Sequence, residues 1–462
     1  MSLLQQTILA LSVHERRRAV SWLNCELHNR REDVRLLFKL RSEQEQTATP
    51  QAEYKAVYGE ADYDADRFRQ LEHQLLKRLE AYLAWEHYQR DTVSPDRHLL
   101  LSLRDRGLDD HRRTRLRRYR PRQPNGTDRL SFEYFHAREQ YEMELAASRG
   151  GRVDYLGPEK ALEHYVIALR LRQTCKTLAH QQLHKSGQHY EIPRLEALFA
   201  AANQKPFREA PFIRLYYLVT RLQLDEAEAA ESSFQELIRL LESSGASLPA
   251  EDQRDLLLLA INYGLRRANT GWEPAIAATF TLYRLGLDRE ILYNRGRISL
   301  FAFNNILGLA LRLKEVEWAT RFMDTEAARL PEKGGSEVLA LGRARLALAN
   351  NQDGEALHHL QQADFKDFIH HLTARVLQLK IYFRQDSYTL LQSHISSTRK
   401  LLTRRRGIGY HLQNYRNIFA LANAVLRLGP GDDKAAEQLR QRIIRMDPCT
   451  EKPWLLSVLK GS

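Results

Sequence analysis

The feature that most constrains this chain is a rhythm of paired helices in its C-terminal half. Segments rich in Leu, Ala, Arg, Glu and Gln, all strong helix formers, alternate there with short polar turns such as "NNQDG" and "RQDS". The second helices of successive pairs start near residues 315, 353, 387 and 433, in steps of 38, 34 and 46 residues. A period of about 34 to 40 residues with two helices per unit is typical of a helical solenoid, because one pair alone cannot bury its apolar faces. The predicted pairs are 298–313 with 315–329, 336–350 with 353–363, 366–384 with 387–403, and 408–428 with 433–447.

The rest of the chain also has helical patterns. Only 22 glycines and 14 prolines occur among 462 residues, and alternating runs of β-branched residues are nearly absent. Ser12 and Glu15 have the spacing of a capping box, in which each side chain satisfies a backbone N–H at the start of a helix. Ser94 can cap another helix that ends before Gly107, and the segment from Asp64 to about Arg90 fits one long helix. We therefore expect an all-α fold, a solenoid of helix hairpins with a helical N-terminal region, and no sheet.

Two segments resemble a known repeat. In "GRARLALANNQDGEALHHLQQADF", small residues stand at Ala344 and Ala347 of a first helix, and Ala356, Leu360 and Ala363 form an Ala-x3-Leu-x2-Ala track on a second. This segment resembles a degenerate tetratricopeptide repeat, and the resemblance implies that its small residues lie buried at helix–helix contacts. The segment "NNILGLALRLKEVEWATRFMDTEAARLP" is similar, with Leu307, Ala319, Met323 and Pro331 at matching positions.

A second resemblance covers the whole chain, including "LLLSLRDRGLDDHRRTRLRRYR". The chain is similar to long, all-helical bacterial proteins of the Bacteroidota, a group without an assigned activity. This resemblance supports the helical fold and implies no chemistry. We divide the chain into an irregular helical N-terminal region at 1–150, irregular helical repeats at 151–297 and tetratricopeptide-like hairpins at 298–462. A loop is expected at 43–53, and a break between helices at 122–128.

The overall charge favours anionic partners. The net charge is +12 and the isoelectric point is near 9.5. The charge is spread along the chain, with +3 in residues 1–150 and +9 in the remaining 312. Three cysteines at long spacings indicate neither a disulfide framework nor a zinc site, and no signal peptide or membrane span is recognisable. These features predict a cytoplasmic protein.

The stretch "DDHRRTRLRRYRPRQPNGTDR", Asp109 to Arg129, contains eight arginines and can be interpreted in two ways. On a helix, Leu108, Arg112, Leu116 and Tyr119 fall on one stripe, and the other arginines flank it. The two aspartates then lie in the first turn and the arginines toward the last, as the helix macrodipole favours. A helix with an arginine-rich solvated face explains the stretch. A nucleic-acid-binding arm is the alternative, since arginine pairs bidentately with phosphate.

A second basic zone has no acidic residue from Ser387 to Pro430. Its charges fit the end of a helix, where cations favour the dipole, and its interleaved aromatics fit a core. The alternative is an anion-binding face that could carry nucleic acid. The residues of that alternative are Arg399, Lys400, Arg404, Arg405 and Arg406, with Tyr388, Tyr410, Tyr415 and Phe419 among the zone's aromatics.

Motifs for catalysis are weak. His180 and His184 share a helix face but lack the glutamate of a zinc protease. Two Glu-x-x-His matches, Glu133 with His136 and Glu355 with His358, are of the kind found in di-iron bundles and are also expected by chance. Cys175 lies in a helical segment, where packing is a better explanation than reactivity. We assign no catalytic, cofactor or metal residue and expect no enzyme, with a metal-dependent enzyme as the remaining alternative.

The best-supported function is a scaffold or adaptor that binds another protein. A solenoid presents a concave surface lined by the first helix of each pair. The repeat register places Asn304, Asn305, Arg312, Arg345, Lys380 and Arg384 on that surface. Such a groove would suit an acidic segment or a C-terminal carboxylate. The alternative is that these are solvated charges on exposed helix faces. Reversing Arg345 and Lys380 to glutamate tests the groove, and we expect both changes to leave folding nearly intact, as substitutions of exposed charges do.

Overall fold

The protein is all-α. A computed structural model describes residues 2–43, 49–90, 94–118, 132–148, 156–183, 190–224, 230–269, 272–404, 409–428 and 433–461. Those residues contain 23 α-helices. Four helices in the C-terminal half, α13, α17, α19 and α21, are 17 residues or longer. Among these helices none is long and apolar enough to cross a membrane. The chain divides into two compact units, one of Met1–Arg122 with Phe135–Leu162, and one of Gln123–Tyr134 with Glu163–Ser462.

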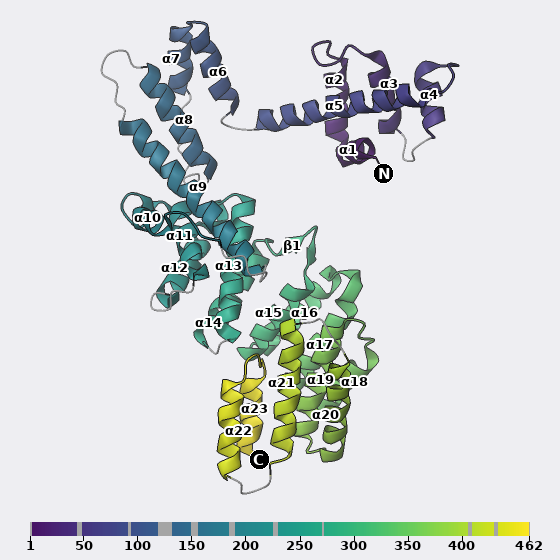
Figure 1. The fold of residues 1–462 in the computed structure, drawn as a ribbon, viewed down its shortest axis with the longest axis vertical. Helices are drawn as coiled ribbons and strands as arrows, with labels where there is room; N and C mark the ends of the chain where they lie inside the picture. The colour runs from purple at the N-terminus through teal and green to yellow at the C-terminus, as the bar shows by residue number, and fades with distance from the viewer. Residues whose placement is uncertain are drawn as a thin grey trace. The chain divides into compact units, whose positions relative to one another are not determined.

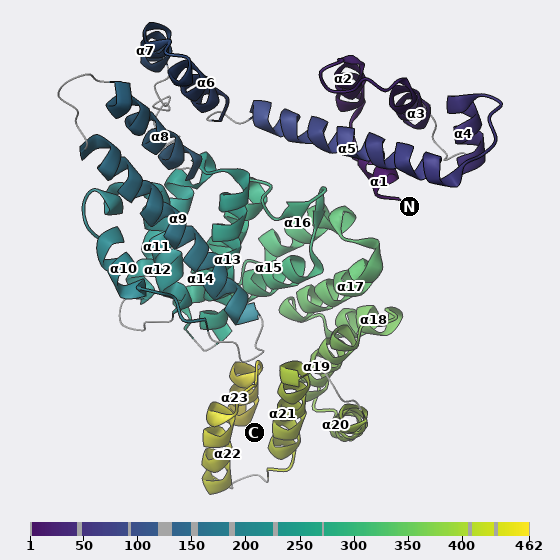
Figure 2. The same cartoon turned by 45° about the horizontal axis from the view of Figure 1, so that its top comes forward.

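In the first unit, α1 to α4 pack around the long helix α5 (Figures 1 and 2). The predicted capping box is present, with Ser12 and Glu15 bonded reciprocally, and the helix predicted from Asp64 runs from Ala65 to Arg90. The expected loop at 43–53 is partly wrong, because α4 begins at Pro50 and Thr49 caps it. The helices are α1 (Leu3–Ala10), α2 (Val13–Asn24), α3 (Glu32–Glu43), α4 (Pro50–Tyr58), α5 (Ala65–Arg90), α6 (Ser94–Asp105), α7 (Asp109–Arg118) and α8 (Phe132–Ser148), whose residues from Phe135 on belong to this unit. The expected break at 122–128 lies outside the described residues.

A closed ion cluster helps to hold the first unit together. Arg41 donates to Glu53 at 2.6 Å and to Glu72 at 2.7 Å, with Arg41 and Glu53 side chains only 7% and 2% exposed. The Arg41 guanidinium lies 5.9 Å from the Phe68 ring of α5, and Phe68 belongs to the hydrophobic core of this unit together with Leu37 and Phe38. Buried charges of this kind are tolerated only when paired, so the cluster fixes how α3, α4 and α5 meet.

In the second unit, each helix from α10 to α22 contacts the next helix along the chain (Figure 1). The helix α17 also contacts both α15 and α19. The eight helices predicted from 298 onward are all present within a few residues of the expected bounds. The helices are α9 (Leu156–Leu183), whose residues from Glu163 on belong to this unit, α10 (Leu195–Ala202), α11 (Pro211–Gln223), α12 (Ala230–Ser244), α13 (Ala250–Asn269), α14 (Pro274–Asp288), α15 (Leu300–Arg312), α16 (Val316–Glu326), α17 (Glu332–Ala349), α18 (Asp353–Gln362), α19 (Phe368–Arg384), α20 (Tyr388–Thr403), α21 (Gly409–Leu426), α22 (Asp433–Arg445) and α23 (Lys452–Gly461), with short 3-10 turns at Phe207–Glu209, Gly245–Ser247 and Ala327–Arg329.

Two expectations need correction. The prediction of no sheet is wrong by one small hairpin, β1 (Tyr293–Asn294) paired antiparallel with β2 (Arg297–Ile298). Its two-residue turn places Arg295 and Gly296 at φ of 51° and 74°, and a tight hairpin turn of this type needs positive φ at both positions. Ala344 and Ala356 are fully buried as predicted, but Ala363 is only half-buried, because α18 ends just before it.

Candidate functional site

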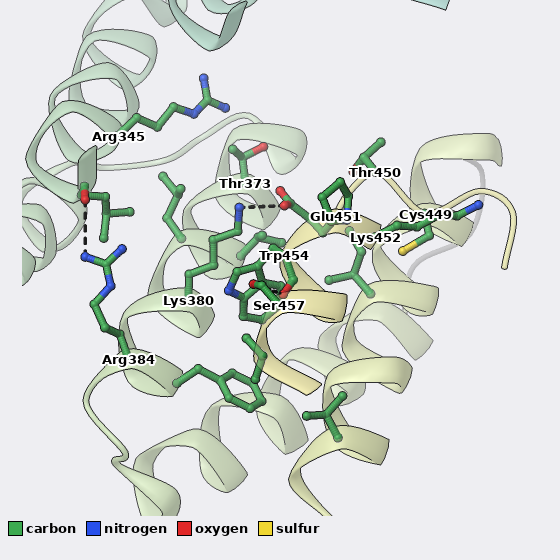
Figure 3. Close-up of a pocket in the computed structure, with 18 of the residues that line it drawn as sticks. Arg345, Thr373, Lys380, Arg384, Cys449, Thr450, Glu451, Lys452, Trp454 and Ser457 are labelled. Carbon is green, nitrogen blue, oxygen red and sulfur yellow. Dashed lines mark hydrogen bonds and ion pairs between the residues drawn. The ribbon is translucent and has the colours of Figure 1, made fainter. Parts of the chain in front are cut away.

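A groove of about 1530 Å³ opens in the second unit. Its walls come mainly from α13, α15, α17, α19 and α21, which are alternate helices along the chain. The segment Asp447–Val458, which joins α22 to α23 and forms the start of α23, supplies the facing wall (Figure 3). Helices that turn one face to their hairpin partners leave another face free, and here those free faces gather around one space.

Four of the six residues predicted on the concave surface line this groove. They are Arg312 on α15, Arg345 on α17, and Lys380 and Arg384 on α19. The two asparagines lie beside it and are engaged within the protein. Asn304 accepts a hydrogen bond from Arg345 Nη1 at 3.1 Å, and Asn305 donates to Tyr283 Oη at 3.2 Å. The asparagines therefore position neighbours, and the cations face the groove.

Three of the four cations already have a carboxylate partner. Arg312 lies 3.4 Å from Glu273, and Arg384 lies 2.9 Å from Asp353. Lys380 Nζ lies 2.7 Å from Glu451 Oε2, and both side chains are about one quarter exposed, at 25% and 26%. Arg312 and Arg384 are exposed, as the alternative of solvated charges on exposed helix faces expects, and each also has a carboxylate neighbour. Lys380 is more buried and paired, so it is a poor site for a charge reversal that should spare the fold.

Arg345 differs from the other three. Among the described residues no carboxylate lies within ion-pair distance of its guanidinium, which donates to Asn304 only through Nη1. Its side chain is half-buried and lines the groove, and this desolvation lowers the pKa of the guanidinium, while Glu451 and Tyr415 oppose the shift. A desolvated guanidinium with no carboxylate in direct contact favours an incoming anion.

The C-terminal segment was not anticipated from the sequence. The Trp454 ring meets the Phe383 ring nearly edge-on, with centroids 5.4 Å apart, and lies 5.7 Å from Lys380 Nζ (Figure 3). Glu451 and Trp454 thus contact α19 at one place, from far along the chain. No motif marks "EKPW" as a groove element, and only the fold brings it to Lys380.

The arginine-rich stretch behaves as the helix interpretation predicts. Arg112 and Leu116 are buried on α7, and Arg112 lies 3.5 Å from Glu144. Arg113, Arg117 and Arg118 are exposed along the rest of the helix. Tyr119 and the remainder of the stretch lie outside the described part of the chain. The described arginines therefore form a solvated face around a buried ion pair.

The second basic zone carries exposed cations. Arg399, Lys400 and Arg404 are exposed on α20 and at its end, and no carboxylate pairs with them among the residues described. Arg405, Arg406 and the Tyr410 side chain are not among those residues. Tyr415 and Phe419 are buried in the core, as the structural interpretation predicts, whereas Tyr388 is 64% exposed and lines the groove.

The histidine and cysteine candidates do not converge. Over the described ranges, no three His, Cys, Asp or Glu side chains gather as a metal site would require. His180 lies 3.2 Å from Tyr190 Oη, and Glu355 lies 3.7 Å from His359, while His358 is exposed. Cys175 is fully buried as expected, and this burial raises the pKa of its thiol to about 12.

Comparison with known proteins gives no further guide. Neither a protein-family model, nor a curated protein, nor a solved structure matches this chain. The groove and its charges are thus the features from which a function is argued.

Proposed function

We propose that the second unit is a solenoid of tetratricopeptide-like hairpins that serves as a scaffold for binding another protein. The proposal rests on the way the first helices α15, α17 and α19 contact one another and present one face to a shared groove. Small residues at Ala319, Ala344 and Ala356 are fully buried, in keeping with the close helix packing of such repeats. The bound partner would lie along these first helices.

The single observation that carries the proposal is that Arg345 has no carboxylate in ion-pair contact among the described residues. Arg312, Lys380 and Arg384 each have a carboxylate within the protein, and Arg345 has none among the described residues. An acidic side chain or a C-terminal carboxylate of the partner supplies the missing charge. The apolar side chains of Leu348, Leu377 and Phe383 line the same groove and would hold the partner's apolar residues.

The test is affinity purification from the native host with three forms of the full chain. Arg345→Gln removes the groove charge, and Arg343→Gln removes an exposed charge from the same helix, outside the groove. Partners identified by mass spectrometry should be lost with Arg345→Gln and retained with Arg343→Gln. If Arg345→Gln folds and keeps every partner, the groove is not the binding site.

A nucleic-acid-binding role is the second candidate, and the exposed cluster Arg399, Lys400 and Arg404 favours it. Binding through phosphates would weaken with salt, with a log–log slope of about −0.9 for each phosphate neutralised on duplex DNA. The measurement is a salt titration of a labelled 20-base-pair duplex, about two helical turns, with wild type and with Lys400→Glu/Arg404→Glu. Equal affinities and slopes for both forms would exclude this face.

A further inference from the structure

Lys380 and Glu451 form an ion pair, and both residues line the proposed binding groove. We propose that Glu451 is a built-in competitor for the groove's ligand: its carboxylate occupies Lys380 here and gives up that ammonium to a carboxylate of a bound acidic segment, which then spans Lys380 and Arg345. This inference rests on the proposed function and adds the identity of the residue that regulates it. Figure 3 shows the three side chains, with Glu451 on the wall opposite Lys380.

The pair is open enough to exchange. The Lys380 and Glu451 side chains are 25% and 26% exposed, so solvent and ligand can reach both charges. In the structural pair of the first unit, Arg41 and Glu53 are 7% and 2% exposed, and no ligand could replace either. Partly exposed ion pairs contribute little to stability. Separating Lys380 from Glu451 is therefore a small cost.

The lysine stays in place when its partner leaves. The Trp454 ring lies 5.7 Å from Lys380 Nζ, and such a ring attracts an ammonium through its quadrupole. Phe383 supports Trp454 from the side, with ring centroids 5.4 Å apart. The aromatic pair thus holds the ammonium toward the groove whether the bound carboxylate is that of Glu451 or that of a ligand.

The gain from exchange comes from Arg345. Replacing one carboxylate by another at Lys380 changes the energy little, because the charge and geometry are alike. A ligand carboxylate that also reaches Arg345 satisfies a desolvated guanidinium that has no carboxylate among the described residues. Acidic ligands are therefore selected over neutral ones, and Glu451 sets the affinity threshold that they must exceed.

The probe is a fluorescein-labelled peptide of eight glutamates, followed by fluorescence anisotropy with the full chain, and a peptide of eight glutamines is the neutral control. Glu451→Gln should tighten binding of the acidic probe about threefold to tenfold, the change expected when a partly exposed ion pair no longer competes. Asp386→Asn is the matched control, because Asp386 is exposed, lines the groove and has φ of 50°, which asparagine also adopts. It removes the same charge and should change affinity less than about twofold.

A Lys380→Met background distinguishes competition by Glu451 for Lys380 from a general effect of the negative charge of Glu451 on ligand binding. In a Lys380→Met background, Glu451→Gln should give little or no further gain. An equal gain from Asp386→Asn, a full gain in the Lys380→Met background, or no gain at all from Glu451→Gln would each overturn the inference. If Glu451→Gln does not fold, Glu451→Asp, which shortens the side chain by one methylene, should tighten binding in the same direction, and unchanged binding there would also overturn it.

Failure of the proposed function gives a different result. If the wild type and Arg345→Gln bind the acidic probe equally, the groove does not recognise carboxylates. The same conclusion holds if the wild type, Glu451→Gln and Glu451→Asp all fail to bind the probe. If Arg345→Gln loses the probe while Glu451→Gln shows no gain, the groove function stands and the competition by Glu451 is wrong.

Discussion

Asn414 and Thr450 are joined by two hydrogen bonds: the Asn414 side-chain amide donates to Thr450 Oγ1 at 3.2 Å, and the Thr450 backbone N–H donates to Asn414 Oδ1 at 2.8 Å. Nearby, Asn417 donates to the Pro448 carbonyl at 2.9 Å. These contacts attach the segment before α23 to α21 and so deliver Glu451 to the groove. The wall that faces α19 is thus set by side-chain contacts to a loop.

Asn414→Ala should destabilise the second unit by about 1 to 3 kcal/mol, because it removes both bonds and leaves a partly buried N–H without a partner. Urea unfolding followed by circular dichroism measures the loss, and hydrogen exchange should increase at residues 447–461. Asn423→Ala is the control on the same helix, since Asn423 is half-buried and its side chain makes no hydrogen bond among the described residues. Equal effects of the two changes would show that the Asn414 contacts do not hold the wall.

Ala356 is fully buried where α18 meets α17. Ala356→Leu should overpack this contact and lower the free energy of unfolding by about 1 to 3 kcal/mol. Gln361→Leu, at an exposed position of the same helix, should change it by no more than about 0.5 kcal/mol. A parent-like urea midpoint for Ala356→Leu would show that the assigned repeat register is wrong.

Replacing two helical glycines, Gly264 and Gly308, by alanine should change the free energy of unfolding in opposite directions. A Cβ at Gly264 would overlap Thr279 Oγ1 and lie 3.1 Å from Phe234 Cζ, whereas one at Gly308 would meet nothing within 4 Å. Gly264→Ala should therefore destabilise by about 1 to 3 kcal/mol through overpacking. Gly308→Ala should stabilise by about 0.5 to 1 kcal/mol, the usual gain in a helix interior. Melting temperatures of the two variants that move in the same direction would contradict the packing of α13 against α14.

His394 should make the second unit sensitive to acid. Its Nε2 donates to the Arg375 carbonyl at 2.8 Å, and burial lowers the pKa of the imidazole to about 4, from an ordinary value near 6.5. Protonation is thus easier in the unfolded chain than in the folded one. Stability is fully present above pH of about 6.5, falls as the pH drops toward 4, and the loss attributable to this group reaches roughly 3 kcal/mol.

The measurement is urea unfolding at pH values from 7.5 to about 4.5 for wild type and His394→Gln, with the span set by the two pKa values. The glutamine can still donate to the Arg375 carbonyl and does not titrate in this range. The wild type should lose more stability on acidification than the variant. Because His371 and Arg375 are present in both proteins, their contributions cancel in the difference, and parallel pH profiles would show that His394 is not held neutral.

The helices could be predicted because their signals are local. Ser12 with Glu15 marked a helix start from two residues three apart, and the segment after Asp64 had helical periodicity over its full length. The prediction went wrong where a few backbone angles decide the outcome. The hairpin at 293–298 depends on positive φ at Arg295 and Gly296, and Ala363 is half-buried because α18 stops one residue earlier than expected.

The candidate site was only partly predictable. The repeat register predicted that Arg345 and Lys380 share one surface, because helical spacing fixes which residues share a face, and both line the groove. It could not show that Lys380 has a partner and that Arg345 has no carboxylate among the described residues, since those facts depend on what the facing wall contributes.

The sequence by itself thus determined the all-α class, the positions of the helices and the helix faces that carry the cations, because periodicity and capping act within a few residues along the chain. The tertiary structure alone decided that Glu451 and Trp454 meet Lys380. Those residues are far apart in the sequence, and their contact depends on Asn414 and Asn417 fastening the segment before α23 to α21. Such contacts leave no periodic trace in the sequence, because their energy comes from side chains of separate helices that only the folded chain brings together.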